Sequence, residues 1–269
     1  MSEASADSVR QDVRQSYAAI ASSGKNSGCC LPAASSSCCE PAMTAEDFAR
    51  NFGYSADDME AVPEGSNMGL GCGNLLAIAS LRAGEVVLDL GSGGGFDCFL
   101  AARQVGDDGR VIGVDMTPEM LAKARDNAGK CGFSNVEFRL CEIERLAVAD
   151  NSVDVVISNC VLNLSPDKPQ VLREAYRVLA PGGRLAIYDV VATKAIPQDI
   201  AKDRRMLCGC ISGAAKVDDL AAWLADAGFS AISIAVKEES REAIKDWAPG
   251  TGVEKFVASA AIEAVKSAS

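Results

Sequence analysis

Short apolar runs alternate with segments of helical periodicity from residue 84 onward. Continuous apolar runs that end in polar residues are typical of parallel strands buried on both faces. Such runs predict strands at residues 86–90, 111–114, 136–140, 153–158 and 184–191. Stretches with apolar residues three and four positions apart predict helices at residues 96–105, 117–130 and 168–179. The alternation predicts an α/β fold whose sheet is doubly wound and mostly parallel.

The alternation pauses after residue 191. Residues 193–217 fit neither pattern, and we expect them to form an insertion above the sheet. Residues 218–228 then predict an amphipathic helix that ends at glycine, and residues 231–236 predict a further strand. Residues 256–265 suit either a strand or a helix.

The N-terminal part of the chain has a different pattern. Apolar residues at positions 9, 13, 17 and 20 predict one short amphipathic helix, and a stretch rich in Ser, Gly and Ala follows it. Residues 43–81 are mostly helical in pattern, with a glycine-rich loop that begins at Gly65. We therefore expect three parts, namely a cysteine-rich N-terminal arm (1–45), a sheet domain with a helical lid (46–192) and a C-terminal part that adds the insertion and completes the sheet (193–269).

The composition narrows the classes of partner. The 269-residue chain has a formal net charge of −11, which disfavours nucleic acid and anionic membrane surfaces as partners. Aromatic residues make up only 5%, which disfavours a base-stacking surface. The N-terminus lacks the apolar segment of a secretory signal, and the longest uncharged stretch falls short of a membrane span. We therefore expect a cytoplasmic protein that binds neither nucleic acid nor membrane.

The chain has no histidine and eleven cysteines. Without an imidazole there is no Ser-His-Asp or Cys-His catalysis, and a metal site must use Cys, Asp or Glu. In a cytoplasmic protein this many cysteines indicate thiols for metal binding or catalysis, because a disulfide framework is typical of exported chains.

Residues 89–95 (DLGSGGG) connect the first predicted strand to a helix. Glycine at Gly91, Gly93 and Gly95 lets the backbone approach a ligand that a Cβ would exclude. Ligands of open α/β sheets bind at this carboxyl edge, beside the helix N-terminus. Asp115, at the end of the next strand, can accept both hydrogen bonds of a ribose diol. The alternative is a glycine turn that binds no ligand.

The spacing G-x-G-x-G, preceded by Asp89, resembles the Rossmann-like class I S-adenosylmethionine (SAM)-dependent methyltransferases more than a dinucleotide-binding motif. The resemblance implies SAM as the cofactor, with Asp89 helping to hold the amino end of its methionine. It also implies that Met116 packs on the adenine face and that Glu142 and Ile143 meet the adenine edge. Asn159, which follows a predicted strand, is a further cofactor-binding candidate. For Glu142 the alternative is a solvated loop acid.

Cysteines gather where the methyl group is expected. Methyltransferases that act on oxygen or nitrogen usually need a base, and no histidine is present to supply one. Instead, three segments bring thiols to one edge of the predicted sheet, namely Cys72 in the glycine-rich loop, Cys160 at a strand end, and Cys208 with Cys210 in the insertion. Thiolates select thiophilic ions. Trivalent arsenic suits three thiolates and keeps a lone pair that can attack a sulfonium methyl group with no proton to remove.

The segments around these cysteines resemble those of arsenite SAM methyltransferases. They are residues 69–74 (GLGCGN), 95–98 (GFDC), 115–117 (DMT), 158–164 (SNCVLNL) and 210–214 (CISGA), within a match from about residue 57 to 228. The resemblance implies that Cys160 and Cys210 hold trivalent arsenic and that Cys72 is either a third ligand or a disulfide partner. It further implies that methylation oxidises arsenic, that protein thiols reduce it again, and that thioredoxin or glutathione resets those thiols. An N-terminal cysteine takes part in some relatives, and the candidates here are Cys29, Cys30, Cys38 and Cys39.

Other interpretations stay open. Cysteine often acts as a small buried hydrophobe, and we interpret Cys98, Cys131 and Cys141 in this way. Cys208 fits a bystander better than a spare ligand. Two other functions remain, namely a small-molecule C- or O-methyltransferase that uses an Asp or Glu base, and a protein that sequesters a soft metal without turnover. Because the expected site needs no second chain, we expect a monomer.

Overall fold

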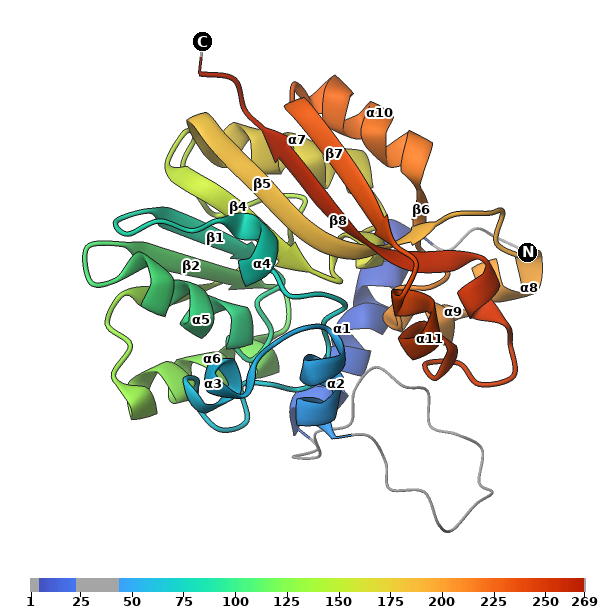
Figure 1. Ribbon diagram of the computed structural model, residues 1–269, viewed down its shortest axis with the longest axis horizontal. Helices are drawn as coiled ribbons and strands as arrows, with labels where there is room; N and C mark the ends of the chain where they lie inside the picture. The colour runs from blue at the N-terminus through green and yellow to red at the C-terminus, as the bar shows by residue number, and fades with distance from the viewer. Residues whose placement is uncertain (1–4, 23–43, 269) are drawn as a thin grey trace.

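The computed structural model describes residues 5–22 and 44–268 of the chain (Figure 1). Within them the strands form one sheet in the order β3-β2-β1-β4-β5-β8-β7, and the short β6 pairs with β5. The parallel strands are β1 (Val86–Leu90), β2 (Arg110–Asp115), β3 (Val136–Leu140), β4 (Val153–Asn159), β5 (Leu179–Ala192) and β6 (Ala215–Lys216). β8 (Val257–Val265) runs antiparallel to both β5 and β7 (Ser230–Lys237). The sheet is therefore doubly wound and mostly parallel, as the alternation predicts.

Helices cover both faces of the sheet, so the strands lie between two apolar clusters (Figure 1). The first cluster includes side chains of α4 (Leu76–Ala79), α5 (Phe96–Val105), α6 (Pro118–Cys131) and α11 (Ser240–Lys245). The second includes side chains of α7 (Lys168–Val178) and α10 (Val217–Ala227). Consecutive strand residues alternate between them, with Val87 in the first cluster and Leu88 in the second. Burial on both faces explains why these strands are continuous apolar runs.

Four helices precede the sheet in the described residues, namely α4 and three earlier helices, α1 (Ala6–Ser22), α2 (Ala45–Asn51) and α3 (Ala56–Glu60). The helices α2 and α3 begin with reciprocal capping boxes, formed by Thr44 with Asp47 and by Ser55 with Asp58. α1 packs against α6 and α9. It therefore joins the N-terminal half of the sheet domain to the segment that follows β5.

Residues 193–217 hold two short helices, α8 (Gln198–Ala201) and α9 (Arg204–Cys208), followed by β6. The following helix and strand, α10 and β7, confirm the predictions for residues 218–228 and 231–236. Residues 256–265, for which the pattern allows a strand or a helix, form strand β8.

Two details differ from the sequence prediction. The helix α7 ends at Val178, and Pro181-Gly182-Gly183 lies within β5 at a register shift against β4. Pro is tolerated there because the irregularity interrupts the pairing with β4, while the Gly182 N–H still donates a hydrogen bond to the Lys266 carbonyl oxygen (2.9 Å). The pattern also gave no sign of α11, which has only six residues. Among the described helices, none is long and apolar enough to cross a membrane. The cysteines at positions 29, 30, 38 and 39 lie outside the described residues.

Candidate active site

A cavity opens at the carboxyl edge of β1, β2 and β4. Its walls come from the loop after β1, the end of β2, the loops after β3 and β4, and the glycine-rich segment before β1. Arg10, Val13 and Tyr17 of α1 close one side. Parallel strands direct their carboxyl ends to one edge, so residues distant in sequence meet here.

The three expected glycines after β1 have different roles. Gly93 has a φ of +51°, and a Cβ there would point into open space. At Gly91 a Cβ would collide with Val161, and at Gly95 it would come within 2.7 Å of Phe99. Only Gly91 and Gly93 line the cavity. The expectation that all three clear space for a ligand is therefore corrected for Gly95, whose missing Cβ lets α5 pack closely.

Asp115 lies at the end of β2 with its carboxylate fixed by two backbone groups. Its Oδ2 accepts a hydrogen bond from the Gly93 N–H (3.0 Å), and its Oδ1 accepts one from the Thr117 N–H (2.8 Å). Desolvation raises the pKa of Asp115 above its ordinary value, against these hydrogen bonds. Met116 follows it in the cavity wall. An acid and an apolar side chain in this order suit a ribose diol and the face of a base.

Two further carboxylates lie beneath the glycine loop. Burial raises the pKa of Asp89 to about 8, and the charge of Asp97 adds to this rise. The Cys98 thiol donates a hydrogen bond to Asp89 Oδ2 (3.1 Å). Desolvation raises the pKa of Asp97 to about 6, against hydrogen bonds from Tyr54 (2.5 Å) and Asn159 (3.2 Å). Burial disfavours the ionised form of both acids, and a cationic ligand such as an ammonium group would stabilise that form.

Asn159, at the end of β4, connects this acidic wall to the glycine-rich loop. Its Nδ2 donates hydrogen bonds to Asp97 Oδ2 and to the Gly73 carbonyl oxygen (2.9 Å), while its Oδ1 accepts one from the Cys72 N–H (2.8 Å). Gly71 packs so closely here that a Cβ would lie 2.7 Å from the Asn159 amide nitrogen. The side chain that the sequence suggested for cofactor binding therefore also fixes the Cys72 backbone.

The segment after β3 differs from the expectation. Ile143 lines the cavity, whereas Glu142 lies outside its wall and forms ion pairs with Arg10 (3.4 Å) and Arg14 (3.5 Å). The acid in the wall is Glu144, which is buried and accepts a hydrogen bond from Ser165 (2.7 Å). Sequence spacing could not separate two acids two residues apart, since only the turn after β3 decides which one faces inward.

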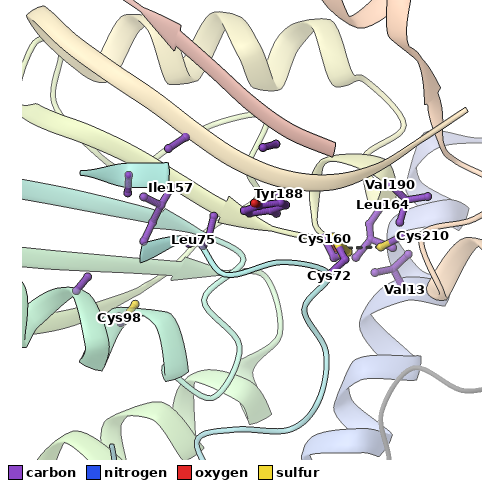
Figure 2. Close-up of a cluster of buried hydrophobic side chains, with 14 of the residues drawn as sticks. Val13, Cys72, Leu75, Cys98, Ile157, Cys160, Leu164, Tyr188, Val190 and Cys210 are labelled. Atoms are coloured by element: carbon purple, nitrogen blue, oxygen red, sulfur yellow. Dashed lines mark hydrogen bonds between the residues drawn. A yellow bond between two sulfur atoms is a disulfide. The ribbon is translucent and has the colours of Figure 1, made fainter. Parts of the chain in front are cut away.

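The three expected thiols meet beside this cavity (Figure 2). Cys72 and Cys160 form a disulfide with a Cα–Cα distance of 6.0 Å. Cys210 is buried next to them, and its Sγ donates a hydrogen bond to the Cys160 carbonyl oxygen (2.8 Å). Val13 and Leu164 pack around the group in an apolar shell. Residues 88 positions apart along the chain are thus joined at one point.

Asp189, a buried acid in the middle of β5, was not among the site residues expected from the sequence. Within the described residues, Cys160, Asp189 and Cys210 form a group whose potential ligand atoms all lie within 4.8 Å of one another. Burial raises the pKa of Asp189 to about 7, against hydrogen bonds from the backbone of Val190 and Asn163. The available signal was a single acid in an otherwise apolar strand sequence.

The remaining described cysteines divide into three environments. Cys98 is buried, as expected, and Cys141 is half-buried in the cavity wall. Cys131 is exposed at the end of α6, which corrects the expectation that it is a buried hydrophobe. Cys208 is half-buried near Ser16 of α1, and it is not part of the group around Cys210.

The fold and this cavity define a class I SAM-dependent methyltransferase. The residues present fit SAM. The open position at Gly93 lets the cofactor approach the backbone, and the fixed Asp115 carboxylate suits its ribose diol. The desolvated acids Asp89 and Asp97 suit its ammonium group. A family model described as a methyltransferase domain matches residues 81–228.

Named relatives narrow the class. The chain is 52% identical to an arsenite methyltransferase from Halobacterium salinarum, over 97% of this chain and 68% of that protein. It is 44% identical to an arsenite methyltransferase from Mus musculus, over 59% of this chain and 44% of that protein. A crystal structure of an arsenic(III) SAM methyltransferase from Chlamydomonas reinhardtii aligns with a TM-score of 0.60 and 33% identity, over 81% of this chain and 72% of that one. The chain belongs to the arsenite methyltransferase family, and it spans less than half the length of the mouse relative.

Proposed function

We propose that this protein transfers methyl groups from SAM to trivalent arsenic held by its own thiolates. The observation that carries the proposal is the meeting of Cys72, Cys160 and Cys210 beside the cavity. Soft thiolates bind trivalent arsenic more tightly than oxygen ligands do. The named activity of the haloarchaeal and mouse relatives supports the same substrate.

The proposed site works without a general base. SAM, when bound, supplies an electrophilic sulfonium methyl group. The arsenic lone pair forms the new As–C bond as the sulfonium S–C bond breaks, so S-adenosylhomocysteine leaves and arsenic is formally oxidised from the trivalent to the pentavalent state. No proton moves in this step, which suits a chain that has no histidine. The apolar shell of Val13 and Leu164 keeps water from the thiolates.

The cysteines have two proposed roles. In the reduced protein Cys160 and Cys210 hold arsenic, and Cys72 is either the third ligand or the partner that forms a disulfide with Cys160. Two thiols that become a disulfide release two electrons, which return pentavalent arsenic to the trivalent state. A thiol reductant such as thioredoxin or glutathione then opens the disulfide. We propose that the protein acts as a cytoplasmic monomer, with residues 193–217 as the arsenic-binding insertion.

Arsenic speciation tests the proposal. Purified protein is incubated with arsenite, SAM and excess thiol, and products are separated by chromatography with mass detection. We expect methylated arsenic from the wild type and a loss of at least about a hundredfold in rate for Cys160→Ser and Cys210→Ser. Cys131→Ser, which replaces an exposed cysteine away from the cavity, is the matched control and keeps the wild-type rate.

Three results would contradict the proposal. Full activity in both site variants would show that these thiols do not hold the substrate. No arsenic product from the wild type, with SAM still bound, would favour a C- or O-methyltransferase that uses an acid as its base. Arsenic bound without consumption of SAM would indicate a sequestering protein.

A further inference from the structure

Asn163 is a fully enclosed amide at the junction of three segments that the thiol site depends on. It lies in the single 3-10 turn after β4 (Leu162–Leu164), three residues beyond Cys160, and only 1% of its surface is exposed. An amide buried to this degree is costly unless each polar atom has a partner. The hydrogen-bond partners of the Asn163 side chain therefore show which segments it connects.

The Asn163 side chain binds β5 and the cysteine-bearing insertion at once. Its Nδ2 donates hydrogen bonds to Asp189 Oδ1 (2.7 Å) and to the Val190 carbonyl oxygen (2.5 Å), and it lies 3.5 Å from the Cys210 carbonyl oxygen. Its Oδ1 accepts a hydrogen bond from the Ala215 N–H (3.2 Å). The segment that carries Cys210 is therefore bound to the Asn163 side chain at the cysteine itself and again at Ala215, five residues later.

The backbone of Asn163 is held just as closely. Its N–H donates to Asp189 Oδ2 (3.3 Å). A Cβ at Gly213 would collide with the Asn163 carbonyl oxygen, so the insertion can pack here only with glycine at that position. Cys160 and Cys210 are themselves in the left-handed region, with φ of +58° and +59°. Conformations of this kind persist only where surrounding contacts impose them.

We propose that Asn163 is a positioning residue that sets the spacing between Cys160 and Cys210, so that the pair chelates trivalent arsenic. The inference rests on the proposed function and extends it to a residue that is not itself part of the cavity lining. Asn163 acts through the Cys210 segment, and Gly213 supplies the space that this contact needs. Chelation by two thiolates requires a fixed sulfur–sulfur distance. Greater mobility of the Cys210 segment therefore lowers the affinity for arsenic more than the affinity for SAM.

The test measures arsenite binding and SAM binding in separate experiments on each variant. The reduced full-length protein is dialysed against arsenite, with Cys210→Ser measuring the arsenic bound by other thiols, and SAM affinity is measured by calorimetry. The variants are Asn163→Leu, which keeps the size and removes every side-chain hydrogen bond, and Gly213→Ala, which disturbs the same contact from the other side. We expect each to weaken arsenite binding by about tenfold or more, with SAM affinity within about twofold of wild type.

The matched control is Asn135→Leu. Asn135 also donates two hydrogen bonds from its amide to backbone carbonyl oxygens, those of Ala102 (3.1 Å) and Gly106 (3.0 Å), but it lies before β3 and outside the cavity wall. We expect it to keep both affinities, even if its melting temperature falls.

The alternatives are distinguishable. Unchanged arsenite binding in Asn163→Leu and Gly213→Ala would overturn the positioning role. So would an equal loss of arsenite and SAM binding, since it would indicate a general loss of structure. A wild-type protein that binds SAM but no arsenite through Cys210 would contradict the proposed function itself.

Discussion

At the scale of single residues, the two cysteines of the proposed arsenic pair share an uncommon backbone conformation. Cys160 and Cys210 both have positive φ values, which L residues other than glycine adopt rarely. The cost is on the order of 1–2 kcal/mol for each residue. Such a cost is retained where the side chain has a role that glycine cannot fill. Ser80, Asn151 and Ala231 also have positive φ values, so the functional interpretation of the two thiols rests on their proximity.

A substitution series at Cys210 should reveal this strain. Both Cys210→Gly and Cys210→Ala remove the thiol, but only glycine adopts the left-handed conformation without a steric penalty. We expect the glycine variant to be more stable than the alanine variant by about 1 kcal/mol in urea denaturation. Equal stability, or a more stable alanine variant, would show that the backbone is not strained at this position.

The buried Asp89 should make stability depend on pH. Burial raises its folded-state pKa from 3.8 to about 8, so between these values the folded protein binds a proton that the unfolded chain releases. Stability therefore falls as pH rises, by about 2 kcal/mol between pH 6 and pH 8 for the protein without SAM. The groups facing Asp89 are Asp97, Asp115 and Cys98, and none of them supplies a compensating positive charge. Chemical denaturation across this range measures the slope, and Asp89→Asn should reduce it by about this amount, while the buried Asp97 and Asp189 account for the slope that is left. An unchanged slope in Asp89→Asn would assign the effect to other groups.

At the scale of elements, α1 connects the cofactor side of the cavity to the thiol side. Arg10 forms an ion pair with Glu144 (3.2 Å) in the cavity wall. One turn further along, Val13 packs into the shell around the cysteines, and the Tyr17 hydroxyl donates a hydrogen bond to the Cys208 carbonyl oxygen (3.1 Å). A single helix thus covers both halves of the site.

Loss of the Arg10 side chain should loosen α1. Arg10→Ala leaves the buried Glu144 without its cationic partner, and we expect this to weaken docking of the helix by about 2 kcal/mol. Hydrogen exchange of the α1 amides should accelerate while the β1 and β4 amides stay protected. Arg14→Ala is the matched control, because Arg14 is more exposed and, within the described part of the chain, forms its ion pair with the more exposed Glu142. Equally faster exchange of the α1 amides in both variants would show that the positive charge of the helix, and not the contact with Glu144, keeps α1 in place.

At the scale of the whole molecule, the cofactor cavity draws its walls from α1, from the segments before and after β1 and from the loops after β3 and β4, so a ligand bound there should stabilise the entire fold. SAM at a hundred times its dissociation constant should add about 2.7 kcal/mol to the free energy of unfolding. For a chain of this size we expect a rise in melting temperature of about 5–10 °C. Scanning calorimetry measures it, and Asp115→Ala should give a smaller rise at the same SAM concentration. An equal rise in Asp115→Ala would contradict the assignment of that carboxylate to the cofactor.

The alternation of strands and helices between residues 84 and 191, and the edge of the sheet at which the cofactor cavity lies, could be predicted from the amino-acid pattern alone. Parallel strands buried on both faces must be continuous apolar runs, and Asp89, Gly93 and Asp115 follow from the positions at which such runs end. The segments around Cys160 and Cys210 are short local motifs as well, and their resemblance to arsenite SAM methyltransferases predicted trivalent arsenic as the substrate.

Which of these residues contact one another could be read from the tertiary structure and not from the pattern. The tertiary structure placed Glu144 rather than Glu142 in the cavity wall, brought Asp189 and Asn163 against the thiol pair, and laid α1 across the opening. These contacts join residues that are tens of positions apart, and they depend on loop conformations and side-chain directions that periodicity does not encode. Sequence patterns report the burial of a segment averaged over its length, whereas the chemistry of the site depends on distances between individual atoms that the packing of the whole chain sets.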